Sequence, residues 1–453
     1  MSKIMKGIQY FSDKDHEMTC QEVFESQFMS GAVTLEVSET PVNYGFLGFG
    51  VAITGASCYE LFQMEPQQRR KILEDIYSED GLNLSVARLS VGASDYSAEL
   101  YSYDDEPFDT ALEHFSVERD KEYIIPMIKE ILEIRPDLYL FASPWSPPGW
   151  MKTGGQMCGG YMRREYIDCY AEYFIRYLKA YEEEGIIIRA VTPQNEPETH
   201  QFGKMPACIW HPEIESSFIL SLKKKLKENN LDVKVWMYDH SFTGTQRVLW
   251  MLENTKGLKE NCDGAAFHYY DGAIEETMKI RKQYPDLELH FTEGGPRLFD
   301  HYGNDWCKWG IMCSKALNLG YRSFTGWNLI LNECGGPNIG PFFCGGLVTE
   351  DRVSKEIEYS GQYKTFRHIA PFIHPDSKIY AVSPDSYFGE YMSQYPNIMK
   401  KTEGFLIENK TEEKVLVLVN PNQNKMQLQI RLEQKWYYVE MMPESISTIV
   451  FQR

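Results

Sequence analysis

The sequence has no apolar stretch long enough to cross a bilayer, since no window reaches the roughly 18 apolar residues that a membrane span requires. Its N-terminus also lacks the apolar run of a signal peptide. Ten cysteines in 453 residues are too few for a disulfide-stapled domain, and none of them forms a CxxC pair. These absences predict a cytoplasmic protein with reduced thiols and no membrane span.

Positive charge and histidine are scarce as well. Lys and Arg number 46 against 65 Asp and Glu, so the formal net charge is −19. Such a surface repels nucleic acid and anionic lipid headgroups, so we expect no nucleic-acid partner. Only ten histidines occur, without HxH or HExxH spacing, and a metal-dependent hydrolase would need clustered ligands. We therefore expect neither a metal nor another cofactor.

Aromatic residues, in contrast, make up 14% of the chain. Aromatic rings fill protein cores, and they also stack on the C–H faces of sugars while their polar tips form hydrogen bonds. Composition alone leaves both interpretations open.

Short apolar runs alternate with amphipathic stretches eight times between about residues 47 and 329. The runs show little polar alternation, which is typical of parallel strands covered on both faces. They are 47–53, 84–91, 138–144, 186–193, 233–239, 264–270, 287–292 and 321–329. Helical patterns lie between them, most clearly at 66–78, 118–134, 164–183 and 212–229. Eight such repeats predict an α/β protein with a (β/α)8 TIM barrel.

Both ends of the chain read as β-structure instead. After about residue 375 the sequence breaks into short alternating runs separated by turn residues, at 404–408, 414–419, 426–432, 436–441 and 445–451. Residues 32–42 alternate in the same way before the barrel starts. We therefore expect an all-β sandwich built from both chain ends, from residues 1–45 and 373–453, with the catalytic barrel at 46–372 between them.

Polar and aromatic side chains gather at the C-terminal ends of the expected strands, where a (β/α)8 barrel carries its working residues. They are Arg88, Trp145, Asn195, Glu196, His268, Tyr270, Glu293 and Trp327. Glycoside hydrolysis needs one carboxyl group to protonate the leaving oxygen and a second to act at the anomeric carbon. The residues alone thus predict a glycosidase with Glu196 and Glu293 as its carboxylate pair.

The order of short motifs resembles glycoside hydrolase family 30, the family that includes glucosylceramidases, over nearly the whole chain. The motifs are Gly48-Phe49-Gly50, Pro144-Trp145-Ser146-Pro147-Pro148, Gln194-Asn195-Glu196-Pro197, Thr292-Glu293-Gly294 and Trp327-Asn328-Leu329. The resemblance implies a retaining β-glycosidase that forms a covalent glycosyl-enzyme. In it, Glu196 takes the place of the acid/base and Glu293 that of the nucleophile. Arg88 and Tyr270 would keep the nucleophile ionised.

The same resemblance implies contacts to the sugar. Asn195 would bind the 2-hydroxyl, a contact that strengthens in the transition state. Asp95, Trp145 and Trp327 would hold the sugar in the first subsite. His268 is either a further subsite contact or a structural histidine. For the two carboxyls we expect a raised pKa for the acid Glu196 and a lowered pKa for the nucleophile Glu293.

The motifs also depart from the glucosylceramidase pattern, notably at Gly55, at Gly326 and in the loop 339–344. These departures weigh against ceramide as the leaving group. We therefore expect an exo-β-glycosidase acting on small-molecule or oligosaccharide β-glycosides, with β-glucosidase favoured over β-xylosidase and β-fucosidase. Glucosylceramidase and endo-β-1,6-glucanase are the alternatives. A catalytically inactive carbohydrate-binding barrel is disfavoured, because both glutamates are present. Homo-oligomerisation stays open.

Overall fold

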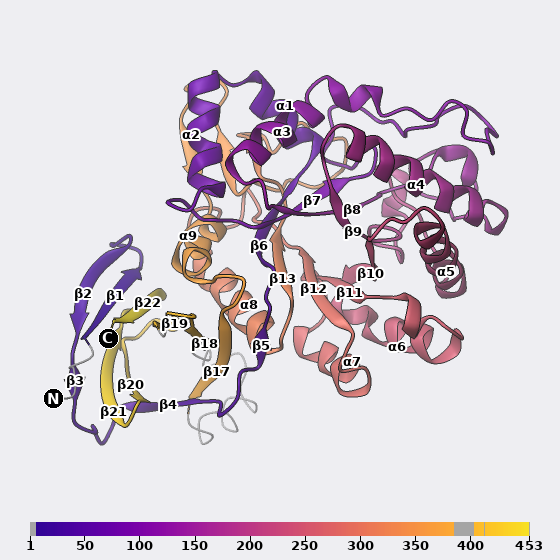
Figure 1. Ribbon diagram of the computed structural model, residues 1–453. Helices are drawn as coiled ribbons and strands as arrows, with labels where there is room; N and C mark the ends of the chain where they lie inside the picture. The colour runs from indigo at the N-terminus through magenta and orange to yellow at the C-terminus, as the bar shows by residue number, and fades with distance from the viewer. Residues whose placement is uncertain (1–5, 385–402, 412, 453) are drawn as a thin grey trace.

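The computed structural model describes residues 6–384, 403–411 and 413–452. Its centre is a closed barrel of eight parallel strands in the order β10-β11-β12-β13-β6-β7-β8-β9 (Figure 1). The strands are β6 Gly48–Ile53, β7 Val86–Ser90, β8 Tyr139–Ser143, β9 Ile188–Val191, β10 Lys234–Ser241, β11 Gly264–His268, β12 Glu288–Glu293 and β13 Ser323–Gly326. Each coincides with one of the eight predicted runs, so the predicted (β/α)8 barrel is confirmed.

Helices surround this barrel because each turns an apolar face toward the strands. They are α1 Gly55–Gln63, α2 Pro66–Tyr77, α3 Ile124–Ile134, α4 Ile167–Glu183, α5 Pro212–Glu228, α6 Thr245–Asn254, α7 Met278–Gln283, α8 Trp306–Asn318 and α9 Gly361–Ile369. The helix expected at 118–134 is shorter than predicted: Glu118–Lys121 forms a 3-10 turn and α3 begins at Ile124. Pro126 explains this start, since proline is tolerated only in the first turn of a helix.

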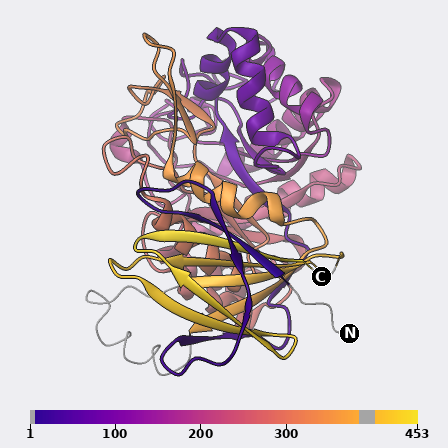
Figure 2. The same ribbon diagram turned by 90° about the vertical axis from the view of Figure 1, so that its left-hand side faces the viewer.

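The chain ends build a second domain. Its 11 strands among the described residues are β1 Lys6–Ser12, β2 Thr19–Val23, β3 Glu25–Ser26, β4 Val33–Val37, β5 Asn43–Tyr44, β17 Lys378–Pro384, β18 Glu403–Glu408, β19 Lys414–Asn420, β20 Met426–Leu432, β21 Lys435–Met441 and β22 Ser445–Gln452. N-terminal and C-terminal strands lie side by side in it (Figure 2). Strand β4 joins its two layers, because it pairs with β17 on one side and β20 on the other.

The barrel and the β-domain share one hydrophobic core. Helices α8 and α9 lie between them, and buried residues of β17, β18, β19 and β22 belong to the same cluster as the barrel helices (Figure 1). At Gly310 of α8, a Cβ would lie 2.8 Å from Cγ2 of Val419, so glycine lets the helix approach β19 closely. The β-domain thus holds the last barrel helices in place. It also has its own core between its layers, around Leu416, Leu428 and Tyr437.

The connection from β13 to α9 is the longest loop region above the barrel and carries a three-stranded sheet of β14 Ile330–Asn332, β15 Val348–Glu350 and β16 Ile357–Tyr359. The segment between β14 and β15 reaches back over the mouth of the barrel, where Tyr96 donates a hydrogen bond to the carbonyl of Phe342. Within the described ranges, no helix has the length and apolar character that crossing a membrane would require.

Candidate active site

A cavity of about 240 Å³ opens at the carboxyl ends of the barrel strands. Seven of the nine predicted site residues line it: Asp95, Trp145, Asn195, Glu196, Tyr270, Glu293 and Trp327. The other two, Arg88 on β7 and His268 at the end of β11, lie buried behind the wall. The remaining lining residues are Thr199, Gln201, Met205, His240, Ser241, Arg297, Phe342 and Cys344.

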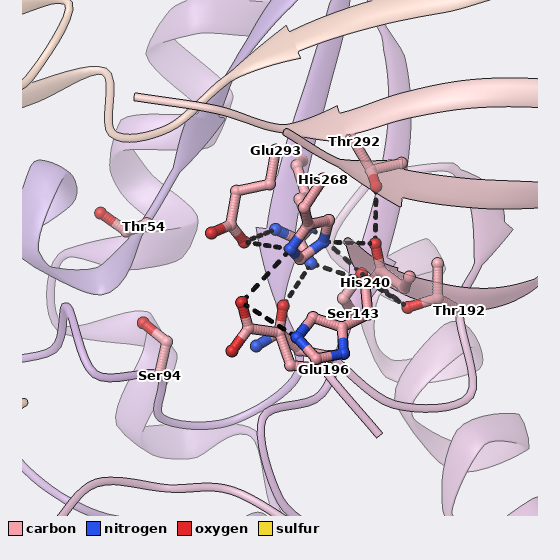
Figure 3. Close-up of polar contacts among 12 residues, drawn as sticks. Thr54, Ser94, Ser143, Thr192, Glu196, His240, His268, Thr292 and Glu293 are labelled. Carbon is pink, nitrogen blue, oxygen red and sulfur yellow. Dashed lines mark hydrogen bonds and ion pairs between the residues drawn. The ribbon is translucent and has the colours of Figure 1, made fainter. Parts of the chain in front are cut away.

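Glu196 and Glu293 face each other across this cavity (Figure 3). Glu293 is the last residue of β12, and Glu196 stands five positions after the end of β9. One carboxylate oxygen of each lies within 4.8 Å of the other. Retaining glycosidases hold their carboxyl groups about 5–5.5 Å apart, whereas inverting enzymes leave about 6.5–9.5 Å for a water molecule. The separation therefore matches the retaining arrangement.

Arg88 ties the site together from inside the barrel. Its Nη1 donates to Oε2 of Glu293, and its Nη2 donates to Oδ1 of Asn195 and Oδ2 of Asp239, both at 2.8 Å. The guanidinium also lies 4.7 Å from the ring centre of Trp145. A buried cation that forks between two carboxylates offsets their charge and fixes where they point.

Asp239 is a central residue that sequence reasoning missed. It is fully buried and accepts five hydrogen bonds or ion pairs, from Arg88, Ser143, Thr192, Thr292 and His268. Burial alone would raise the pKa of Asp239, but the Arg88 and His268 charges and these donors hold it far below its usual range. Its position at the end of the predicted fifth strand was the available signal.

A bulge in β10 places Asp239 there. The register with β11 shifts between Tyr238 and His240, and both Tyr238 and Asp239 have positive φ, of 77° and 65°. Non-glycine residues rarely adopt such angles, and bulges often re-aim a side chain next to an active site. As a result Asp239 points into the barrel, while His240 faces the cavity. His240 was likewise not predicted.

His268 is enclosed by carboxylates. Its Nε2 lies 3.0 Å from Oδ1 of Asp239, and its Nδ1 lies 3.4 Å from Oε1 of Glu196 and 3.8 Å from Oε2 of Glu293 (Figure 3). Burial would lower the pKa of His268, but these three negative charges raise it to about 9. The imidazole is therefore protonated at neutral pH. Of the two roles left open for His268, the structure favours the one without a sugar contact, because the side chain lies behind the carboxylates and not on the cavity wall.

Glu196 is held in a strained backbone conformation with φ of 51°. Its carboxylate accepts a hydrogen bond from Nε2 of Gln201 and lies 3.9 Å from Nε2 of His240. Burial would raise its pKa, yet the bond and charge of His268, with His240 and Gln201, lower it. The expected raised pKa of this residue was thus wrong for the free protein. The sequence could not show that an imidazolium stands beside it.

Aromatic rings and one carboxyl form the rest of the wall. Trp145 and Trp327 stack at 5.1 Å with an interplanar angle of 21°, and Tyr96 packs edge-on against Trp327. Asp95 is buried, and its Oδ1 has no hydrogen-bond partner among the described residues. Burial, followed by the charges of Glu293 and Glu196, raises the pKa of Asp95 well above its usual range. A buried carboxyl oxygen without a partner suits a ligand hydroxyl.

Tyr270 lies differently from the expected donor to Glu293. Within the described part of the chain its hydroxyl makes no hydrogen bond to Glu293. Its ring packs against His268 and lies 5.6 Å from the guanidinium of Arg297. Burial and then the negative charge of Glu293 raise the pKa of Tyr270 well above its usual range. In this geometry Arg88 is the group bonded to Glu293.

Glu196, His268 and Glu293 also have the spacing of three metal ligands. The local charges do not fit a cation, since the Arg88 guanidinium already binds Glu293 and His268 is itself an imidazolium. A metal ligand must be a neutral imidazole with a free lone pair. The arrangement instead resembles a carboxylate pair neutralised by two buried cations.

Comparison with known proteins supports the interpretation of Glu196 and Glu293 as a glycosidase carboxylate pair. The model for the "Glycosyl hydrolase family 30 TIM-barrel domain" matches residues 46–374. The lysosomal acid glucosylceramidase of Mus musculus is 31% identical over 64% of this chain and 61% of its own length. SrfJ from Salmonella typhimurium has a TM-score of 0.89 at 25% identity, covering 99% of this chain and 100% of that one. An endo-β1,6-glucanase has a TM-score of 0.85, with the same identity and coverage. The chain therefore belongs to glycosyl hydrolase family 30 and is a glycoside hydrolase.

Proposed function

We propose that this protein is a retaining exo-β-glycosidase in which Glu293 is the nucleophile and Glu196 the acid/base. The observation that carries this proposal is the pair of carboxylates within 4.8 Å, of which only Glu293 is bonded to the buried Arg88. A guanidinium that binds a carboxylate fixes its direction and offsets its charge, which suits a nucleophile held in place for attack. The other carboxylate, Glu196, faces two histidines, His268 and His240, which places it beside groups able to exchange a proton.

In the first step Glu293 attacks the anomeric carbon while Glu196 protonates the leaving oxygen. A covalent glycosyl-enzyme forms, and the charge of Glu293 disappears. In the second step Glu196 takes a proton from water, which attacks the same carbon and releases the sugar with its β-configuration retained. Asn195 is positioned for the 2-hydroxyl, since Arg88 fixes its Oδ1 and leaves its amide NH2 for the ligand.

The size of the cavity supports exo-cleavage. Its volume of about 240 Å³ lies below the roughly 300–1,000 Å³ of pockets for drug-sized ligands, which fits a single sugar ring. Asp95 and the Trp145–Trp327 pair offer a hydroxyl acceptor and an apolar wall for that ring. Among sugars we favour β-glucosides, with β-xylosides and β-fucosides next.

The second candidate is endo-β-1,6-glucanase activity. It is favoured by the solved endo-β1,6-glucanase, which matches this fold over 99% of the chain. Glucosylceramide is a third candidate, because a mouse lysosomal acid glucosylceramidase is among the relatives. A screen of aryl β-glycosides that differ only in the sugar, followed by product analysis on β-1,6-linked gluco-oligosaccharides, separates these activities. Release of single sugars from the chain end supports exo-action, and mid-chain products refute it.

Variants of the two carboxylates test the mechanism. Glu293→Ala is expected to lower turnover by several orders of magnitude, because the covalent step is lost. Glu196→Ala is expected to slow glycosides with poor leaving groups far more than activated aryl glycosides. Proton NMR of the first product should show the β-anomer. An α-anomer, or equal losses for both leaving groups, contradicts the assignment.

Location and assembly also remain proposals. We infer a cytoplasmic enzyme from the low cysteine density, which fits a reducing compartment. Cell fractionation tests the location, and light scattering tests whether the enzyme forms a homo-oligomer.

A further inference from the structure

The buried imidazole of His268 has one near neighbour on each side that matters for proton transfer. Its Nε2 is held at 3.0 Å by Asp239, a carboxylate that four other donors also bind. Its Nδ1 has no well-aligned hydrogen bond among the described residues and points toward Oε1 of Glu196 at 3.4 Å. The ring is therefore anchored on one side and free to exchange a proton on the other.

The six groups that face this ring come from five strands or strand ends. The negative ones are Asp239 on β10, Glu196 after β9 and Glu293 on β12; the others are Arg88 on β7, His240 on β10 and Tyr270 after β11. Three carboxylates against one guanidinium leave an excess of negative charge in a buried part of the site. A proton on the imidazole reduces this excess, and the ring is placed to hold it.

We propose that His268 stores the proton that Glu196 delivers to the leaving group, and that Asp239 holds the imidazole in place for this transfer. This inference rests on the proposed role of Glu196 as the acid. His268 acts through Glu196 and touches no substrate, so it is a positioning residue. It accounts for how a carboxyl that is ionised in the free enzyme can still act as an acid.

The transfer balances in both half-reactions. First the Nδ1–H bond breaks, its electron pair stays on Nδ1, and an O–H bond forms at Oε1 of Glu196. Glu196 then gives a proton to the glycosidic oxygen, which keeps the electrons of the broken bond to the anomeric carbon. In the second half, the attacking water loses a proton to Glu196, and this proton returns to Nδ1.

The charge of Glu293 determines whether the proton moves from His268 to Glu196 or back again. In the free enzyme Glu293 is an anion 3.8 Å from Nδ1 and helps to hold the proton on His268. In the glycosyl-enzyme that anion has become an ester, so this attraction is lost and the neutral imidazole is favoured. Release of the sugar restores the anion, and with it the protonated imidazole. The proton store is thus refilled once in each cycle.

The test compares pH profiles of kcat/KM for the wild type, His268→Asn and His290→Asn. His290 is a matched buried barrel histidine that stacks on Trp236, and the carboxylate beside it is that of Glu288 and not of a catalytic residue. Phenyl and 4-nitrophenyl glycosides of the best sugar serve as poor and good leaving groups. For the wild type the alkaline limb should follow His268, near pH 9. In His268→Asn it should move to clearly lower pH, because Glu196 alone then holds the proton, and phenyl glycosides should lose most.

A uniform loss of activity in His268→Asn, with an unmoved alkaline limb, would overturn the proposal and leave His268 a structural role. If this variant does not fold, 15N NMR of the wild-type histidines decides the question. The His268 resonance should be that of an imidazolium at pH 7.5 and of a neutral ring after Glu293 is trapped with a 2-fluoro glycoside. A neutral His268 ring in the free enzyme would refute the proposal that this residue stores the proton. Failure of the trapping reaction itself would instead count against Glu293 as the nucleophile.

Discussion

The buried pairing of Arg88 with Asp239 yields a prediction about stability that is independent of any substrate. Arg88→Met removes a guanidinium whose side chain is fully buried, and it leaves Asp239 and Glu293 without their main counterion. Removing one partner of a buried ion pair costs about 3–5 kcal/mol, since the remaining charge stays in a medium that solvates it poorly. We expect a decrease of that size in the free energy of unfolding.

A double-mutant cycle separates this pair from general damage to the barrel. Asp239→Asn alone loses the charge but keeps a side chain of the same shape, so we expect a smaller loss, about 1.5–3 kcal/mol. In Arg88→Met/Asp239→Asn the orphaned carboxylate is gone. The loss should therefore fall short of the sum by about 0.5–3 kcal/mol.

Urea denaturation followed by tryptophan fluorescence provides the measurement, with the slope m checked for each variant. Arg164→Met is a suitable control, because Arg164 lies on the surface and its ion pair with Glu213 is exposed. That change should cost less than about 1 kcal/mol. A loss below about 1 kcal/mol for Arg88→Met, or strict additivity in the cycle, would refute the reasoning.

Two further predictions concern the walls of the site, and a third concerns a buried lysine outside it. Asp95→Asn should raise the free energy of unfolding at neutral pH by about 1–3 kcal/mol and should lower kcat/KM. The pKa of Asp95 is raised in the fold, so its ionised form destabilises the folded state as the pH rises. Unchanged stability above pH 6 in a urea titration would count against this. Trp327→Ala should cost about 3–5 kcal/mol and raise KM, because the ring is buried against Trp145; a loss of stability without a change in KM argues against a subsite role. Burial lowers the pKa of Lys152 to about 8, so the fold favours its neutral form. The stability of the wild type should therefore rise between pH 8 and 10.5. In Lys152→Met this rise of stability with pH should be absent from thermal melts, and an unchanged rise would reject the explanation.

Much of the fold was readable from local patterns. Each barrel strand is buried on both faces, so its apolar run stands out without knowledge of its neighbours, as in Phe49–Ile53 and Gly264–His268. The β-rich chain ends were also recognisable from their alternation. Their layer arrangement was not, because β4 pairs with residues 345 positions away in β17 and 395 positions away in β20.

The same distinction between local sequence patterns and long-range contacts applies to the active site. The sequence by itself determined that the chain is a barrel, that Glu196 and Glu293 stand at strand ends, and that tryptophans accompany them, because side-chain type and strand order are local information. The tertiary structure alone decided that a bulge turns Asp239 inward, that His268 lies between three carboxylates, and that Glu196 is consequently ionised in the free enzyme. A pKa depends on charges a few ångströms away, and those charges come from strands that only the closed barrel brings together.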